Sequence, residues 1–196
     1  GEIGDLFFVE SEYAHNYENV PGVGGWRKGP RRREPFLGGG CHAVDLVRWI
    51  AGDVAEVYAL SNHTMLPGWP VDDCWISCLR FKNGVIGKVF VSVGCKRPYT
   101  MRSVFYGSRG TIICDNTSDH IQVYRDGKEQ LSTGFARVPV ATASHNVQRE
   151  VAYLLEALRG EHPMELDARE GARTVATCLA AVESSASGHP VRVAEF

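Results

Sequence analysis

Apolar and polar residues alternate along several short segments of the chain, which is the pattern of strands that bury one face. The first segment covers residues 5–14, around Leu6, Phe8 and Glu10. Further strands are predicted at residues 55–62, 74–81, 85–93, 102–106, 111–114 and 121–124, with a short one near Gln130. Two connections contain Asn-Gly or Asp-Gly pairs, at residues 83–84 and 126–127, which tolerate the positive φ of tight hairpins. The strands are therefore expected to form an antiparallel meander.

Three segments instead show the 3.6-residue period of amphipathic helices. The first covers residues 41–51, and the second runs from Ser144, a predicted N-cap, to Leu158. The third begins with Asp167 and Glu170 in capping-box spacing. The apolar stripes of the second and third helices are expected to face the core and comprise Val147, Val151, Leu154, Leu155 and Leu158, then Ala172, Val175, Ala176, Leu179 and Val182.

Hairpin-joined strands followed by two helices indicate an α+β fold rather than an alternating parallel one. The chain has 196 residues, 44% of them hydrophobic, which is enough for a complete core, so residues 1–196 are assigned to one domain. Residues 16–36 form a long connection rich in glycine, proline and arginine. Loops of that length within a domain usually carry function.

The formal net charge of −2 gives no attraction to nucleic acid or to an anionic membrane. No apolar run reaches the length of a membrane span, and no signal-type sequence begins the chain. A small, roughly neutral ligand and a cytoplasmic location are therefore expected.

The six cysteines contain no Cys-x-x-Cys motif. Cys74 and Cys78 share a predicted strand, where they lie about 13 Å apart, too far to share a disulfide or a metal ion. All six are expected to be reduced and most of them buried. No His, Asp or Glu cluster has metal-ligand spacing, so no catalytic metal is predicted.

Gly38-Gly39-Gly40 leads directly into the first predicted helix, whose first turn carries His42. Glycine permits close approach, and the first N–H groups of a helix can receive a polar substrate atom. The helix field favours a neutral imidazole, which can accept a proton from a hydroxyl and return one to a carbonyl. Asp45 follows on the same helical face and could orient the ring. Both residues could equally be ordinary polar groups of a first turn.

Other polar side chains are candidates for substrate contact. Tyr13 and His15 share one face of the first strand and point together at a substrate or at a neighbouring element. Trp26 and Arg27, in the long loop, could close over a substrate or pack against the domain.

The first helix resembles the active-site helix of the glucose-fructose oxidoreductase and inositol dehydrogenase family, which reads Asp-x-Gly-x-His-x-x-Asp-Leu-x-x-Trp. The matching residues are Gly40, His42, Asp45, Leu46 and Trp49. The resemblance extends over nearly the whole chain, through residues 1–5, 26–27, 144–146 and 190–193.

This resemblance implies the C-terminal substrate-binding and oligomerisation domain of the family, similar to the C-terminal domain of glyceraldehyde-3-phosphate dehydrogenase. Such a domain has a large, mainly antiparallel open sheet with helices on one face, and its open face pairs with another subunit. The resemblance further implies hydride transfer between NAD or NADP and a sugar, cyclitol or related polyol. His42 is then the acid/base, and His145 approaches the substrate from the far side.

Two departures from the family pattern bear on function. The family places an aspartate four residues before the histidine, where this chain has Gly38. The chain also lacks Gly-x-Gly-x-x-Gly after a strand, since residues 22–25 read as a loop, so no cofactor-binding residue is assigned here. It is expected to be the C-terminal part of a longer oxidoreductase, inactive without its N-terminal Rossmann domain. The alternative is a non-catalytic oligomerisation or ligand-binding module.

Overall fold

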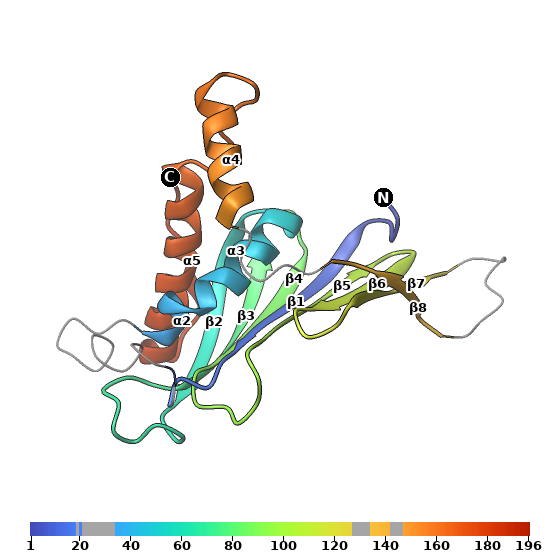
Figure 1. Ribbon diagram of the computed structural model, residues 1–196. Helices are drawn as coiled ribbons and strands as arrows, with labels where there is room; N and C mark the ends of the chain where they lie inside the picture. Colours follow the sequence, from blue (N-terminus) through green and yellow to red (C-terminus); the bar gives the residue numbers. More distant parts are fainter. Residues whose placement is uncertain (19, 21–33, 127–133, 142–146) are drawn as a thin grey trace.

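The computed structural model describes residues 1–18, 20, 34–126, 134–141 and 147–196. These residues form an α+β domain built on one mixed, mostly antiparallel sheet of nine strands (Figure 1). The strands are β1 (Leu6–Ala14), β2 (Val54–Asn62), β3 (Cys74–Phe81), β4 (Ile86–Ser92), β5 (Thr100–Gly107), β6 (Gly110–Asp115), β7 (His120–Arg125), β8 (Ala136–Pro139) and β9 (Val191–Arg192).

The helices are α2 (Pro35–Gly38), α3 (Gly40–Ala51), α4 (Val147–Leu158) and α5 (Ala168–Ser187). Helices α2, α3 and α5 lie on one side of the sheet, and α4 extends beyond the body of the domain (Figure 1). The opposite face of the sheet is uncovered in the described part of the chain. The α+β class and the open sheet expected from the sequence are therefore confirmed.

The predicted meander is wrong in one respect. The strand order is β8-β7-β6-β5-β1-β4-β3-β2-β9, so β1 is inserted between β4 and β5. It pairs with β4 in parallel, with Phe8 opposite Ile86, and with β5 antiparallel. Hairpin turns in the sequence predict only the pairing of strands that are adjacent in the chain. They do not predict where β1 inserts, at the centre of the sheet, where Val9 is fully buried. The expected strand near Gln130 and the N-cap at Ser144 lie outside the described residues.

The expectation that the α4 stripe belongs to the core is also wrong. No α4 residue is buried, and Leu158 is 71% exposed. In α5 the buried face consists of small residues shifted from the predicted stripe, whereas Val175 and Leu179 are exposed. Small side chains allow α5 to lie close to β2, where the Ser184 hydroxyl accepts the N–H of Ala59 at 3.0 Å. The predicted Asp167 cap is confirmed, since its carboxylate accepts two backbone N–H groups.

The cysteines differ in their exposure. All six cysteines are free, as expected, but only Cys178 is buried and Cys78 is exposed, so the expectation of mostly buried thiols is wrong. Cys78 belongs to the outward set of β3 residues, whereas the alternate positions are buried. Within the described ranges no helix is long and apolar enough to span a bilayer.

Candidate functional site

The first turn of α3 rests directly on the centre of the sheet. A Cβ atom at Gly39 would lie 2.5 Å from the Tyr13 ring, and one at Gly40 would lie 2.6 Å from Val91. Both distances are too short for any larger residue, so these glycines bring the helix into contact with β1 and β4. The glycines expected to make room for a ligand therefore accommodate protein side chains instead.

His42 projects from this turn as an exposed side chain. Its ring stacks on Tyr13, with 6.1 Å between ring centroids and 27° between ring planes. Among the described residues, none forms a hydrogen bond with the His42 ring, and the side chain is exposed.

Tyr13 connects His42 to a group of aromatic residues beneath the helix. The Tyr13 hydroxyl hydrogen-bonds to the Tyr17 hydroxyl at 2.9 Å and to Nδ1 of His15 at 3.3 Å. Tyr13 is only 7% exposed, which leaves little of its surface for direct contact with a substrate. The structure therefore brings together three sequence candidates, His42, Tyr13 and His15.

Two further rings complete this aromatic cluster, which we define as Tyr13, His15, Tyr17, His42, Trp69 and Tyr99. The Tyr99 ring lies 4.7 Å from His15 and 5.5 Å from Tyr13, measured between centroids. Burial raises the pKa of the Tyr99 hydroxyl, so it stays protonated near neutral pH. Sequence reasoning missed Trp69 and Tyr99, because only the strand order brings their loops beside the end of β1.

Three backbone N–H groups around the start of α3 are already hydrogen-bonded. The Gly38 N–H donates to the Glu34 carbonyl at 2.8 Å, and the Gly39 N–H donates to the Pro35 carbonyl at 2.9 Å. The His42 N–H donates to the Gly39 carbonyl at 3.2 Å. These three amides are therefore not open to a ligand.

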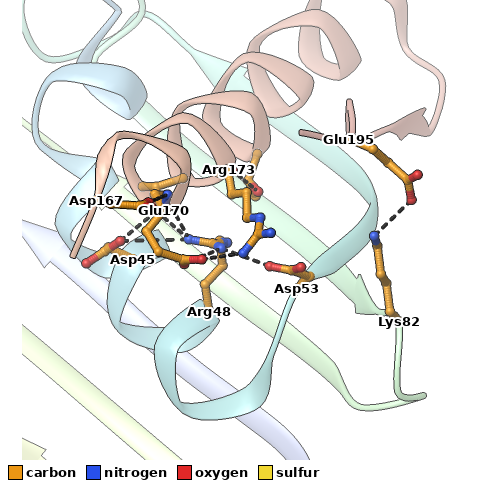
Figure 2. A network of polar contacts seen from close by, with 10 residues as sticks. Asp45, Arg48, Asp53, Lys82, Asp167, Glu170, Arg173 and Glu195 are labelled. Atoms are coloured by element: carbon orange, nitrogen blue, oxygen red, sulfur yellow. Dashed lines mark hydrogen bonds and ion pairs between the residues drawn. The ribbon is translucent and has the colours of Figure 1, made fainter. Parts of the chain in front are cut away.

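Asp45 does not orient the His42 ring in this structure. Its carboxylate accepts a hydrogen bond from the Thr174 hydroxyl at 2.6 Å and lies 3.9 Å from the Arg48 guanidinium. Both contacts direct Asp45 toward α5 (Figure 2). This placement favours Asp45 as an ordinary polar group of the helix over a role in orienting the His42 ring.

Arg48 is the centre of a polar hub that joins the end of α3 to the start of α5 (Figure 2). Its side chain is only 5% exposed. It donates to Asp53 at 2.8 Å, to the Glu170 carboxylate at 3.2 Å and to the Thr174 hydroxyl at 2.8 Å. The hydrogen bond from Arg48 lowers the pKa of the Asp53 carboxyl despite some opposing desolvation.

Several sequence candidates fall outside the described residues, namely Trp26, Arg27, His145 and the glycines of residues 22–25. In the part of the chain that the structure describes, no group of three or more His, Cys, Asp or Glu residues could hold a metal ion. Tyr13 and Val91 occupy the space beside Gly39 and Gly40, so these two glycines leave no room for a dinucleotide phosphate.

Comparisons with known proteins give a family match and similar solved structures for this chain. The family model for the oxidoreductase family, C-terminal alpha/beta domain, matches residues 1–193. No curated protein matches the sequence. A solved structure of levoglucosan dehydrogenase in complex with NADH is 20% identical with a TM-score of 0.86, over 100% of this chain and 60% of that chain.

Two bacterial structures show the same likeness. An oxidoreductase domain protein from Kribbella flavida is 22% identical with a TM-score of 0.85, over 100% of this chain and 60% of that one. An oxidoreductase from Agrobacterium radiobacter, in complex with NAD+, L-tartaric acid and magnesium, is 23% identical with a TM-score of 0.77, over 98% and 58%. The chain thus spans about 60% of the length of the structures it matches. With the family model covering almost every residue, the chain belongs to the oxidoreductase family that its sequence resembles, as a C-terminal alpha/beta domain.

Proposed function

We propose that this chain is the substrate-binding domain of an NAD(P)-dependent dehydrogenase acting on a sugar, cyclitol or related polyol. The observation that carries the proposal is the exposed His42 imidazole held above the aromatic cluster. Tyr13, Tyr17 and Trp69 are buried, whereas His15, His42 and Tyr99 keep exposed surface. Imidazole nitrogens and a tyrosine hydroxyl suit the hydroxyl groups of a sugar. Similar solved structures of levoglucosan dehydrogenase contain NADH with L-sorbose or with levoglucosan, which supports this substrate class.

His42 is the proposed acid/base of the reaction. Oxidation of a secondary alcohol removes a hydride from carbon and a proton from oxygen. The neutral His42 ring accepts that proton and, being exposed, releases it to water; in the reverse direction the protonated ring donates it to the carbonyl oxygen. His15, and Trp26, Arg27 and His145 from outside the described residues, are proposed to contact the substrate hydroxyls.

The nicotinamide cofactor is assigned to a separate nucleotide-binding domain, because this sequence lacks Gly-x-Gly-x-x-Gly after a strand and protein side chains fill the space beside Gly39 and Gly40. The exposed α4 stripe supports such a partner. A helix of 12 residues with no buried side chain is marginal by itself, so a covering surface would stabilise it. We propose that the nucleotide-binding domain provides that cover.

The cysteines bear on location. All six are free, and we propose that they reflect a reducing, cytoplasmic location.

The open face of the sheet supports homo-oligomerisation. Leu60 and Ile76 are cross-strand partners on β2 and β3, and they are 55% and 41% exposed. Ile86 adds a third exposed apolar side chain on β4. Exposed apolar side chains on an uncovered sheet face are typical of interaction surfaces, so we propose that a second copy of the protein packs here.

One observation favours a second candidate function, a non-catalytic oligomerisation or ligand-binding module. Gly38 stands where the family has an aspartate, and Asp45 contacts α5 rather than His42. In such a module His42 would bind a hydroxyl group without transferring its proton.

A cofactor-linked screen of the intact protein distinguishes the two functions. The protein is supplied with NAD+ or NADP+ and a panel of sugars, inositols and anhydrosugars, and the absorbance of the reduced cofactor is followed. The dehydrogenase proposal predicts cofactor reduction with at least one member of the panel. Binding of a polyol, measured calorimetrically, without cofactor reduction by any member would establish the module instead.

A further inference from the structure

We propose that Tyr13 is a positioning residue whose ring fixes the orientation of the His42 imidazole. This inference rests on the proposed acid/base role of His42. It assigns to Tyr13 a task other than contact with the substrate, which its burial disfavours.

The Tyr13 ring is held on several sides. The Gly39 backbone lies against it, so closely that a Cβ there would be 2.5 Å from Cε1 and 2.7 Å from Cζ. Its hydroxyl is tethered by Tyr17 and His15, and the Tyr99 ring contacts it edge-on. A side chain constrained in this way has essentially one rotamer, and it therefore offers a fixed surface to its neighbour.

His42 is the neighbour that needs such a surface. An exposed side chain on a helix otherwise samples several rotamers, and each displaces the ring nitrogens by ångströms. Stacking on Tyr13 selects one of them. Because proton transfer requires hydrogen-bond distance to the substrate hydroxyl, misplacement of this ring lowers the rate of the chemical step more than substrate affinity.

The first test compares Tyr13→Val with Tyr13→Phe in the intact enzyme. Tyr13→Val removes the stacked ring and is expected to lower kcat about tenfold or more with KM changed less than about threefold. Tyr13→Phe keeps the ring and is expected to retain kcat within about threefold. Leu79→Ala, a core truncation on β3 two strands from β1, controls for general loss of packing and should keep kcat.

Three results would overturn the inference. The first is a kcat of Tyr13→Val equal to that of Leu79→Ala. The second is a raised KM of Tyr13→Val with unchanged kcat, as for a substrate contact. The third is a loss of kcat in Tyr13→Phe as large as in Tyr13→Val, which would make the hydroxyl the active feature. The His42→Asn variant is measured in parallel. If it keeps normal turnover, the proposed function fails; if it loses turnover while Tyr13→Val does not, only the positioning role fails.

A second test begins with a variant that leaves Tyr13 in place. Gly39→Ala places a methyl group against the Tyr13 ring and should displace it, reproducing the loss of kcat at nearly constant KM. In the Tyr13→Val background, Gly39→Ala should lower kcat little further. It should also lower the midpoint of thermal unfolding less than it does in the wild-type background. Equal effects of Gly39→Ala in both backgrounds, on kcat and on thermal unfolding, would show that Tyr13 is not held by this contact.

Discussion

Asp73, at the residue scale, organises the loop that carries one wall of the aromatic cluster. It is 1% exposed, and its Oδ2 accepts the N–H groups of Met65 and Leu66 at 2.7 Å each. These bonds hold residues 65–73, and hence Trp69, against the start of β3. Its Oδ1 is buried and makes no hydrogen bond to any described residue.

Asp73→Ala is expected to lower the free energy of unfolding by about 2 kcal/mol, because the buried Leu66 N–H and the partly buried Met65 N–H lose their acceptor. Asp73→Asn keeps one acceptor oxygen for both groups and should lose less than half as much. Chemical denaturation of the two variants measures this difference. Equal losses would mean that the two N–H bonds do not carry the contribution of Asp73.

Residue chemistry could be predicted in part. His42 was identifiable because a helix start and a glycine run are local features of the sequence. Its proximity to Tyr13 follows from packing of α3 on β1, and Tyr99 joins only through the pairing of β1 with β5. Such contacts depend on tertiary structure, which alternation and spacing do not encode.

At the scale of elements, the Arg48 hub fastens α3 to α5. The buried guanidinium bridges Asp53 and Glu170, so the helix that presents His42 is tied at its far end. Removal of one partner would leave a buried charge poorly compensated, which is the costly case for such a group.

The hub predicts a pH dependence of stability. The Asp53 pKa lies below its ordinary value of 3.8 in the folded state, so its ion pair stabilises the fold above that value and is lost as the pH falls through the lowered pKa. Asp53→Asn should therefore reduce the free energy of unfolding at neutral pH, and the difference from the wild type should shrink as the pH falls below 3.8. The expected size is about 1 kcal/mol or less, because the carboxylate is 36% exposed and partly screened.

Urea denaturation across this pH range provides the measurement. Asp126→Asn, an exposed change after β7, controls for loss of one negative charge. A difference between Asp53→Asn and the wild type that stays constant, or that grows in acid, would contradict the assignment.

Periodicity located the helices but not the surfaces that cover them. The α4 stripe has the expected apolar spacing, yet its side chains are exposed. In α5 the close approach of β2 selects alanine, threonine and serine, so the larger Val175 and Leu179 point outward. An apolar stripe therefore shows that a helix has a partner surface, without showing which domain or subunit provides it.

At the scale of the whole molecule, the two faces of the sheet differ. Helices α2, α3 and α5 cover one face, and the other face is uncovered in the part of the chain that the structure describes (Figure 1). The central parallel pair β1–β4 escaped prediction because no local turn connects those strands.

Ile76→Glu tests the open face as a subunit interface. A new carboxylate at a packed subunit interface would lose its hydration, which is unfavourable, so the variant should sediment as a smaller species than the wild type. Since Ile76 is partly exposed in one subunit, the fold itself should tolerate the change. Met65→Glu, an exposed apolar site in the loop after β2, is the matched control. Unchanged sedimentation of Ile76→Glu would exclude this face from the interface.

The turnover of His42→Asn in the intact enzyme tests the central claim most directly. With the best substrate of the screen at saturation, the account predicts that kcat falls about a hundredfold or more, the usual contribution of a positioned acid/base, while circular dichroism stays that of the wild type. A folded His42→Asn enzyme that retains kcat within about threefold of the wild type would contradict it.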